Sequence, residues 1–334
     1  MILITGGLGY IGSHTAVSLL KKGYDVLILD NLSNSNIEVI DGIELASGFR
    51  PQFVKIDLQE NLNVSALFKK YTIKGIVHFA AFKAVKESVI NPIAYYNNNI
   101  TTLLNLLIEV KNLSYSIPFV FSSSCCVYGQ PEELPINENS PILSQISPYG
   151  NTKKIGEEIL YDAVSALDNL RVISLRYFNP IGAHESVAIG ELPLGIPQNL
   201  VPYITQTAAG IHPKLTIFGN DYPTFDGTNI RDYIHVMDVA DAHVVSLDRI
   251  FDNKMNDYYE VFNLGTGKGT SVLEIIENFE RVTGKKINYE IGERREGDAV
   301  ATYADPKKAN NILGWKAIRT LDIALASAWQ WEKK

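Results

Sequence analysis

Short apolar runs alternate with longer amphipathic segments through the first half of the chain. The runs are rich in Val, Ile and Leu and predict strands at residues 2–5, 25–29, 52–56, 75–79, 118–122 and 171–177. Apolar residues at helical spacing between them predict helices over 10–22, 60–71, 92–112 and 148–167. Strands that are apolar almost throughout and are separated by helices are typical of a parallel sheet covered on both faces. The pattern therefore predicts a doubly wound α/β domain.

The pattern changes near residue 180. From there on Pro and Gly interrupt short segments such as IPQNLVPYI and GTNIRDYIHV, and one further helix is expected over 271–283. We therefore divide the chain into a doubly wound domain, residues 1–180, and a smaller C-terminal α/β domain, residues 181–334. Because the second domain lacks a long sheet of its own, we expect it to close a cleft over the first, with parts returning to pack on the first sheet.

The charge and the apolar runs narrow the class of partner. A net charge of -7 and a pI of about 5.5 argue against nucleic acid or an anionic membrane as the main partner, since both require a basic surface. No apolar run approaches the roughly 20 residues of a membrane span, and the strand predicted at residues 2–5 leaves no room for a signal peptide. The sequence thus predicts a cytoplasmic protein.

Cysteine and histidine give no metal-binding pattern. The only cysteines are the neighbours Cys125 and Cys126, and six histidines are scattered along the chain without ligand spacing. If the cysteines lie in a strand, their side chains point to opposite faces, so a disulfide between them is strained. We expect neither a metal nor a disulfide.

A glycine-rich turn follows the first predicted strand. In TGGLGYIG, Gly6, Gly9 and Gly12 permit a tight turn and close approach of a pyrophosphate to a helix N-terminus. Asp30 ends the second predicted strand about 18 residues later, where an acid binds the adenosine ribose. Because its carboxylate repels a 2'-phosphate, the pattern predicts a Rossmann domain that binds NAD rather than NADP. The later GTGKGTS, residues 265–271, lacks the Ser or Thr that a P-loop requires after its Lys.

A tyrosine and a lysine occur four residues apart in SPYGNTK. Ser147 is the expected N-cap of a helix with Pro148 at its first position, which places Tyr149 and Lys153 on one face. We expect the ammonium and a cationic nicotinamide to favour the phenolate of Tyr149, which can then exchange a proton with a sugar hydroxyl.

Three serines end the fifth predicted strand. Ser124 is the candidate for a hydrogen bond to the same substrate hydroxyl, whereas Ser122 and Ser123 are expected to form hydrogen bonds at the strand end. The site is thus predicted from several parts that converge on one point.

Motifs along the whole chain resemble one family. TGGLGYIGSH, HFAAFKAVKES, SSSCCVYG, SPYGNTK, RYFNPIGAH, GIPQNL, IFGNDYPTFDGTNIRDYIHVMD, NLGTGKGTSVLE and RREGD are similar to those of UDP-glucose/UDP-galactose 4-epimerases, extended short-chain dehydrogenase/reductases. The resemblance implies an NAD-dependent isomerase that interconverts UDP-glucose and UDP-galactose. It implies that Tyr149 takes the proton of the carbon 4 hydroxyl as hydride leaves for NAD, and that the 4-keto sugar turns over before the hydrogen returns.

The resemblance also implies the binding residues. For NAD they are Gly6, Gly9, Tyr10, Ile11, Gly12, Asp30, Asn31, Asp57, Leu58, Phe79, Ala80, Ala81, Lys83, Asn98, Tyr149, Lys153 and Phe178. For the UDP-hexose they are Ser124, Tyr149, Asn179, Asn199, Leu200, Thr216, Phe218, Arg231, Tyr233, Arg295, Asp298 and Thr302. The catalytic set is Tyr149, Lys153 and Ser124. Two arginines in an acidic protein suit a diphosphate, because their forked guanidinium groups bind it bidentately.

The two cysteines distinguish this chain from nucleotide-sugar 4,6-dehydratases of the same fold. Those enzymes carry Asp-Glu, an acid and a base that eliminate water, where this chain has Cys125 and Cys126. A neutral thiol replaces neither group well, so we expect no elimination and regard both cysteines as packing residues.

Thr302 concerns specificity. Some members of the family carry a large aromatic residue there, at the hexose end of the pocket, and the smaller Thr302 leaves volume for a 2-acetamido group. We therefore expect UDP-N-acetylglucosamine and UDP-N-acetylgalactosamine to be substrates too.

The sequence also bears on two alternative functions and on the oligomeric state. A non-catalytic NAD-binding redox sensor would not need Ser124, Tyr149 and Lys153 together with two diphosphate arginines, and a nucleotide-sugar dehydrogenase would consume free NAD. Members of the family are commonly homodimers that pair the helices near 97–112 and 152–167, and the apolar residues of those helices suit either a dimer interface or the core.

Overall fold

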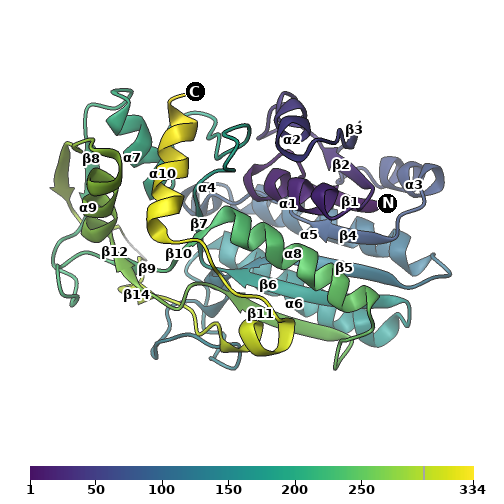
Figure 1. The fold of residues 1–334 in the computed structure, drawn as a ribbon. Coiled ribbons are helices and arrows are strands. Elements are labelled where there is room, and N and C mark those ends of the chain that lie inside the picture. Colours follow the sequence, from purple (N-terminus) through teal and green to yellow (C-terminus); the bar gives the residue numbers. More distant parts are fainter. Residues whose placement is uncertain (296–297) are drawn as a thin grey trace.

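A seven-stranded sheet forms the larger part of the molecule (Figure 1). The computed structural model describes residues 1–295 and 298–334. All neighbouring strands of the sheet are parallel, in the order β11-β6-β5-β4-β1-β2-β3. The strands are β1 (Ile2–Thr5), β2 (Val26–Asp30), β3 (Gln52–Lys55), β4 (Gly75–His78), β5 (Ile117–Ser124), β6 (Leu170–Tyr177) and β11 (Tyr259–Leu264). The six predicted strands are confirmed, with ends that differ by two residues at most.

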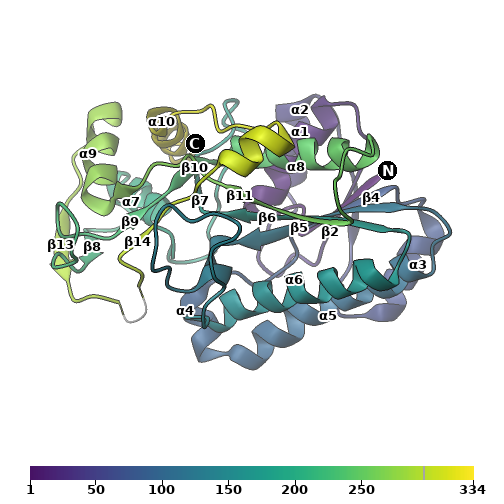
Figure 2. The same ribbon diagram turned by 90° about the horizontal axis from the view of Figure 1, so that it is seen from below.

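Helices cover both faces of this sheet (Figure 2). One face carries α1 (Tyr10–Lys21), α2 (Val39–Ser47) and α8 (Val236–Phe251), and the other carries α3 (Asn61–Lys70), α5 (Pro92–Lys111) and α6 (Pro148–Ala166). Each set of helices packs buried Leu, Ile and Val side chains on the sheet, so there are two separate apolar layers. The predicted doubly wound fold and its four predicted helices are thus confirmed.

Two elements from beyond residue 180 pack on the large sheet. Strand β11 pairs with β6 at the sheet edge, and α8 lies across α1. The sequence pattern predicted neither a strand at 259–264 nor a helix at 236–251. As an edge strand, β11 has sheet neighbours on one side only and keeps some of its side chains partly exposed, so its sequence lacks the continuous apolar run of the central strands.

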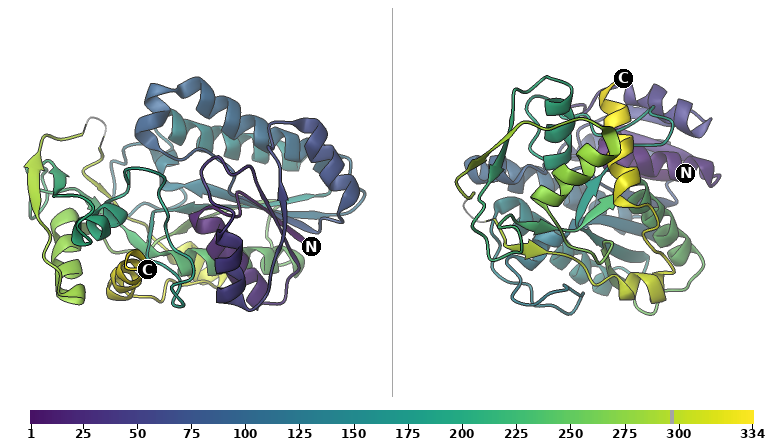
Figure 3. Two further views of the ribbon diagram at one scale, coloured as in Figure 1. Left: turned by 90° about the horizontal axis from the view of Figure 1, so that it is seen from above. Right: turned by 60° about the vertical axis from the view of Figure 1, so that its left-hand side comes forward.

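A smaller part packs beside the carboxyl end of the sheet (Figure 3). Its core lies between α7 (Leu200–Ala208), β8 (Leu215–Phe218), α9 (Val272–Thr283), β13 (Tyr289–Gly292) and α10 (Leu321–Glu332). Short pairings join it to the rest through β7 (Asn179–Ile181), β9 (Ile230–Arg231), β10 (Tyr233–His235), β12 (Thr270–Ser271) and β14 (Ala301–Thr302). The remaining elements are α4 (Val85–Ile90) and the short helices η1 (Cys125–Tyr128) and η2 (Ala309–Leu313). The helix predicted at 271–283 is α9, which begins with a capping box between Ser271 and Glu274.

The cysteines lie in a tight turn and not in a strand. Strand β5 ends at Ser124, and the next four residues form η1, so the predicted strand geometry for Cys125 and Cys126 is wrong. Both thiols are free. Among residues 1–295 and 298–334 there is no helix long and apolar enough to cross a bilayer, and no cluster of side chains that could hold a metal ion.

Candidate active site

A cleft of about 1930 Å³ runs along the carboxyl ends of the sheet strands to the smaller part of the molecule. Strands β1 and β4 are neighbours, but the chain leaves β1 toward β2 and leaves β4 toward β5, which makes the point between them a topological switch. Ligands of doubly wound proteins bind at such points. The strand order therefore places the cleft at the switch point between β1 and β4.

The cleft brings together most of the residues predicted from the sequence. Those in its wall are Gly6, Gly9, Tyr10, Ile11, Gly12, Asp30, Asn31, Asp57, Leu58, Phe79, Ala80, Ala81, Lys83, Asn98, Tyr149, Lys153, Asn199, Phe218, Arg295 and Asp298. Eight predicted residues lie outside that wall, namely Ser124, Phe178, Asn179, Leu200, Thr216, Arg231, Tyr233 and Thr302.

The glycine turn leaves no space for side chains. Gly6 has a φ of 65°, and a Cβ placed on it would lie 2.8 Å from the backbone N of Ala80. A Cβ on Gly12 would lie 2.5 Å from the carbonyl O of Gly6. Helix α1 begins directly after Gly9, which has no side chain to cap it, so the first N-H groups of the helix face the cleft. Such an arrangement binds an anionic group.

Asp30 is held rigidly at the end of β2. Its carboxylate accepts hydrogen bonds from the backbone N-H groups of Leu8 (3.1 Å) and Leu32 (2.9 Å) and from the hydroxyl of Ser35 (2.8 Å). Beside it Asn31 donates to Asp57 (3.1 Å). These acceptors lie in the cleft wall, where they suit the hydroxyl groups and the exocyclic amino group of a nucleoside.

Helix α6 positions the catalytic candidates. Ser147 accepts a hydrogen bond from the N-H of Gly150, and Pro148 is the first helical residue, as predicted. Lys153 is buried, and its Nζ donates to the carbonyl O of Ser122 at the end of β5 (2.6 Å). Burial lowers the pKa of Lys153 to about 8. The lysine therefore remains charged at neutral pH, but only by a small margin.

Burial has the largest effect on the pKa of Tyr149 in the protein without ligands. Burial and then the neighbouring Cys126 raise it well above its ordinary value, and the hydrogen bond of Ser124 only partly opposes them. The ammonium of Lys153, which we expected to favour the phenolate together with a cationic nicotinamide, donates to the carbonyl of Ser122 in β5. In the protein without ligands Tyr149 is a neutral phenol.

The serines at the end of β5 have three different partners. Ser122 shares a hydrogen bond with the hydroxyl of Tyr177, and Ser123 donates to Glu157. Ser124 caps η1, because its Oγ accepts the N-H of Cys126 (3.2 Å). The prediction that Ser122 and Ser123 form strand-end hydrogen bonds is confirmed, and only Ser124 adjoins the Tyr149 hydroxyl.

The sequence did not predict a buried ion pair that lies one helical turn beyond Lys153 on α6. Glu157 accepts from the guanidinium of Arg176 at 2.9 and 3.2 Å, and both side chains are buried. Arg176 also donates to the hydroxyl of Tyr128 in η1 (2.9 Å). The sequence signal that could have indicated a role for Glu157 was its four-residue spacing from Lys153, which places both side chains on one face of α6. The pair ties α6 to β6 and η1.

The two cysteines have different surroundings. Cys125 packs with the apolar cluster around Val127 and Phe178, whereas the Cβ of Cys126 faces the first turn of α6 at Gly150. Hydrogen bonds from the Cys125 thiol and the Ser124 hydroxyl, and the charge of Arg231, lower the pKa of Cys126 to about 6. The thiol of Cys125 has a raised pKa because it donates to Cys126 and is buried.

The far end of the cleft carries aromatic and cationic groups. The guanidinium of Arg295 lies 3.9 Å from the centre of the Phe218 ring. Arg231 in β9 lies just outside the wall, where it donates to the carbonyl of Ala299 (2.9 Å) and lies 3.6 Å from the carboxylate of Asp298, a wall residue. This end therefore suits a planar ring next to a polyanion.

The remaining predicted residues lie on the elements that flank the cleft. Phe178 is buried between β6 and β7, while Asn179 in β7 is paired in register with Tyr233 in β10. The buried side-chain oxygen of Asn179 has no partner among the described residues. Thr216 lies in β8, Leu200 starts α7, and Thr302 in β14 is paired in register with Arg231.

Comparisons with known proteins agree with this geometry. A family model described as GDP-mannose 4,6 dehydratase matches residues 3–327. UDP-glucose 4-epimerase of Bacillus subtilis is 47% identical over 331 residues, which cover 99% of this chain and 96% of that protein. The chain belongs to the UDP-glucose 4-epimerase family.

Solved structures of the family have the same fold. UDP-glucose 4-epimerase from Stenotrophomonas maltophila, with bound NAD and formylated UDP-arabinopyranose, has a TM-score of 0.95 and 44% identity, covering 99% of this chain and 97% of its own. The UDP-Glc/GlcNAc 4-epimerase of Campylobacter jejuni has a TM-score of 0.84 and 38% identity, covering 99% and 98%.

Proposed function

We propose that this protein interconverts UDP-glucose and UDP-galactose through a 4-keto intermediate, with NAD as a bound cofactor. The observation that carries the proposal is that Tyr149 and Lys153 lie in the wall of one cleft, with Ser124 next to Tyr149, and that other parts of this wall suit a dinucleotide and a diphosphate. NAD, when bound, accepts the hydrogen of carbon 4 and returns it.

The residues present fit NAD. The turn at Gly6 and Gly12 excludes even a Cβ, so a pyrophosphate can approach the backbone and the first N-H groups of α1. Asp30 already accepts three hydrogen bonds and presents its carboxylate in the cleft wall, where it would bind the ribose hydroxyls. Asn31 and Asp57 would lie at the adenosine end, and Asn98, Tyr149 and Lys153 at the nicotinamide end.

The chain's own groups move the proton. Tyr149 takes the proton of the carbon 4 hydroxyl and returns it to the carbon 4 oxygen after the sugar has turned over. Ser124, next to Tyr149, holds that hydroxyl in position. Since burial raises the pKa of Tyr149, the phenolate needs positive charge nearby. Lys153 supplies one such charge and stays fixed by its bond to the Ser122 carbonyl.

The nucleotide end holds the substrate through both half-reactions. We assign the diphosphate to Arg231 and Arg295 and the uracil ring to the side of Phe218. The partnerless side-chain oxygen of Asn179 would accept a donor of the nucleotide sugar. Binding energy at this end retains the 4-keto sugar while the hexose, held less tightly, turns over.

We also assign UDP-N-acetylhexoses as substrates. Thr302 lies outside the cleft wall but is paired in register with Arg231, to which we assign the diphosphate. Because Thr302 is small where some members of the family carry a large aromatic residue, we infer that it leaves volume beside the sugar. A related protein of known structure is named a UDP-Glc/GlcNAc 4-epimerase. Thr302→Tyr should abolish turnover of UDP-N-acetylgalactosamine and retain that of UDP-galactose. A parent protein that does not turn over the acetamido sugar would refute the assignment.

We further propose a cytoplasmic homodimer. Leu104 and Ile108 on α5 and Tyr161 on α6 are 41%, 46% and 61% exposed, whereas Leu103 and Leu106 of the same apolar stripe are buried in the core. The exposed set can pair α5 and α6 with those of a second copy. Free thiols at Cys125 and Cys126 suit a reducing compartment.

The experiment that tests the proposed function is NMR of the purified protein with UDP-galactose and no added NAD. Conversion to the carbon 4 epimer would support both the reaction and a bound cofactor. A protein that leaves UDP-galactose unchanged even after NAD is supplied would refute the proposal, and the redox-sensor alternative would then lead.

A further inference from the structure

The segment between β7 and α7 runs along the active-site cleft. It leaves β7 beside the glycine turn, because the hydroxyl of Tyr10 donates to the carbonyl of Gly182 (2.5 Å). Most of residues 188–199 then line the cleft wall, and α7 follows at Leu200. The segment therefore leads from the cofactor side of the cleft to the smaller part of the molecule.

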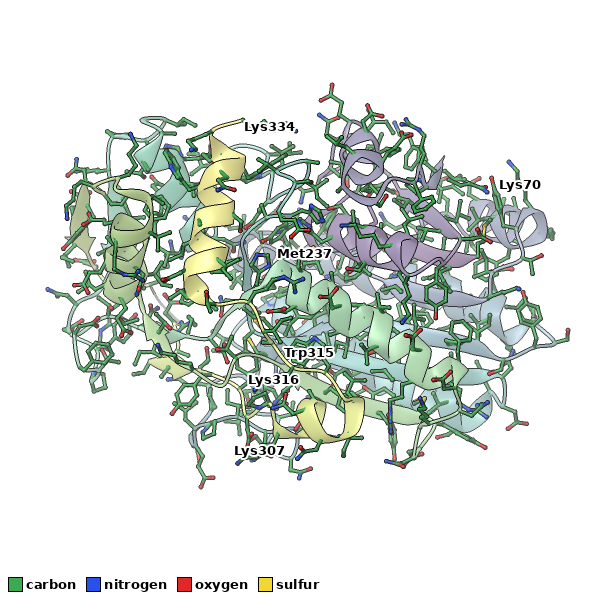
Figure 4. The ribbon with its side chains drawn as sticks, in the orientation of Figure 1. Lys70, Met237, Lys307, Trp315, Lys316 and Lys334 are labelled. Carbon is green, nitrogen blue, oxygen red and sulfur yellow. The ribbon has the colours of Figure 1, made fainter. Side chains whose placement is uncertain are left out.

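Helix α10 fixes the backbone in the middle of this segment. The indole N-H of Trp331 donates to the carbonyl of Glu191 (2.9 Å). A Cβ on Gly190 would lie 2.4 Å from the Trp331 ring, so the ring packs directly on the main chain there. Lys334, labelled in Figure 4, lies just beyond α10 and also lines the cleft. The main chain at Glu191 is thus held at the cleft wall.

The carboxylate of Glu191 contacts two polar side chains of the cleft wall. Its Oε1 accepts a hydrogen bond from Nδ2 of Asn199 (2.6 Å) and lies 3.5 Å from Nζ of Lys83. The side chain of Glu191 is 11% exposed and that of Lys83 is 53% exposed. Burial, and then the charge of Glu191, raise the pKa of Tyr10 at the glycine turn. The carboxylate is therefore largely shielded from water and lies near the predicted pyrophosphate site.

Lys83 belongs to the cofactor side of the cleft. It follows β4, and Ala80 in the same connection packs on the glycine turn, where a Cβ on Gly6 would lie 2.8 Å from the backbone N of Ala80. An ammonium in this part of the wall suits an anionic cofactor. Its contact with Glu191 joins the cofactor side to the segment that leads into α7.

Asn199 belongs to the substrate side of the cleft. It is the N-cap residue of α7, but its side chain forms no hydrogen bond with the helix backbone. An asparagine at this position usually caps its helix, so the bond to Glu191 takes the place of a favoured local one. Helix α7 packs on β8, which carries Phe218, the residue to which we assign the uracil ring.

The charge of Glu191 is unfavourable for the ligands themselves. NAD and a UDP-hexose each carry a diphosphate, so a carboxylate in the wall opposes the binding of both. Among the described residues, Lys83 is the cation within ion-pair distance of Glu191. The carboxylate can still favour binding if it orients the groups that contact the ligands, because side chains fixed in advance lose less entropy when a ligand binds.

We propose, on the basis of the function proposed above, that Glu191 is a positioning residue for both ligands. It orients the Lys83 ammonium toward the cofactor and the Asn199 amide toward the diphosphate end of the nucleotide sugar. One N-H of that amide is bonded to Glu191, so its other N-H and its oxygen have fixed directions. Lys83 is half exposed, and the carboxylate confines its ammonium to the cleft.

Two substitutions separate the two contacts. Glu191→Gln keeps an oxygen that accepts from Asn199 but loses the charge that holds Lys83, whereas Glu191→Ala loses both. Because both variants lack the carboxylate, its repulsion of anions is absent from both, and the difference between them isolates the hydrogen bond to Asn199. The matched control is Glu185→Gln, which removes an exposed carboxylate from the same connection between β7 and α7.

UDP is the probe of the substrate side. Calorimetric titration of NAD-loaded protein should give a dissociation constant for UDP at least threefold larger in Glu191→Ala than in Glu191→Gln. The constant in Glu185→Gln should stay within twofold of that of the parent protein. Equal constants in the two Glu191 variants, or an equally large change in the control, would overturn the role at Asn199.

Retention of NAD is the probe of the cofactor side. After loading with NAD and dialysis, Glu191→Gln and Lys83→Met should each lose NAD at least threefold faster than the parent, as measured by absorbance. The double variant should lose NAD no faster than Lys83→Met, because Glu191 acts through Lys83. Additive losses, or a Glu191→Gln protein that retains NAD as well as the parent, would overturn the role at Lys83.

Binding measurements separate this role from the reaction. A parent protein that binds both ligands but does not convert UDP-galactose would refute the proposed function and leave the role of Glu191 standing. A parent that converts UDP-galactose, with binding unchanged in the Glu191 variants, would refute the role of Glu191 alone. A parent that binds neither ligand would refute both.

Discussion

Replacing Lys153 by Met should make the protein more stable and inactive. The unfolded chain keeps the lysine proton up to a pH near 10.5, whereas the folded protein releases it at about 8, because the ammonium is buried. At about 1.4 kcal/mol for each pKa unit, burial of the charged group opposes folding by about 3 kcal/mol at pH 7. This penalty is fully present below pH 8 and is lost as the pH rises toward 10.5.

The substitution also removes a favourable contact. The bond from Nζ to the Ser122 carbonyl is 2.6 Å long, and a buried hydrogen bond contributes about 1 kcal/mol. Lys153→Met should therefore raise the free energy of unfolding by about 2 kcal/mol at pH 7. With an unfolding entropy of about 2.1 cal/mol/K for each of 334 residues, Tm should rise by about 3 °C.

The assay is urea denaturation from pH 7 to pH 10, on protein stripped of nucleotide, because a ligand that binds only the folded state adds its own stabilisation. The control is Lys154→Met, which removes a partly exposed lysine 3.6 Å from Glu158 and should change stability by less than about 0.5 kcal/mol. A variant less stable than the parent at pH 7, or a difference that does not shrink as the pH rises, would refute the reasoning.

Three further predictions concern the active site and the residues around it. Tyr149→Phe should lower kcat for UDP-galactose, measured by NMR, by about 10²–10⁴-fold and leave Tm, measured by thermal unfolding, unchanged. Turnover near that of the parent protein would exclude Tyr149 as the base. In Gly12→Ala the new Cβ would lie 2.5 Å from the carbonyl O of Gly6, so the purified protein should contain less NAD, as measured by absorbance. A normal NAD content would contradict the assignment of the glycine turn to the pyrophosphate. Iodoacetamide should label Cys126 before Cys125, and the rate at Cys126 should rise as the pH passes about 6. Equal labelling of the two cysteines, measured by mass spectrometry, would disprove a thiolate at Cys126.

Local patterns predicted the parts of the site that lie close together in sequence. The Ser147 cap, the first-turn Pro148 and the shared face of Tyr149 and Lys153 all follow from helix geometry, and the structure has them. The partner of Lys153 could not be predicted this way, because the Ser122 carbonyl lies 31 positions earlier and meets the lysine only through the fold.

The other features that the sequence did not predict depend on contacts between segments that are far apart in the chain. Residues 259–264 form the seventh strand because β6 offers an open edge, and their own pattern does not require it. A cavity between α1, α8 and α10 brings together Lys21, His184 and His235, which are far apart in sequence. Spacing rules describe one helix or one strand at a time, so they contain no information about such a meeting.

The end of strand β5 explains why the catalytic geometry should survive the loss of Lys153. Consecutive side chains of a strand point to opposite faces, so Ser122 and Ser123 can engage different partners. The Ser122 carbonyl holds Lys153, and the Ser123 hydroxyl holds Glu157, one helical turn further along α6. Tyr149 lies one turn before Lys153 on the same face. Because the Glu157 anchor remains when the lysine is replaced, α6 keeps its register on β5, and the lost activity can be assigned to the missing charge.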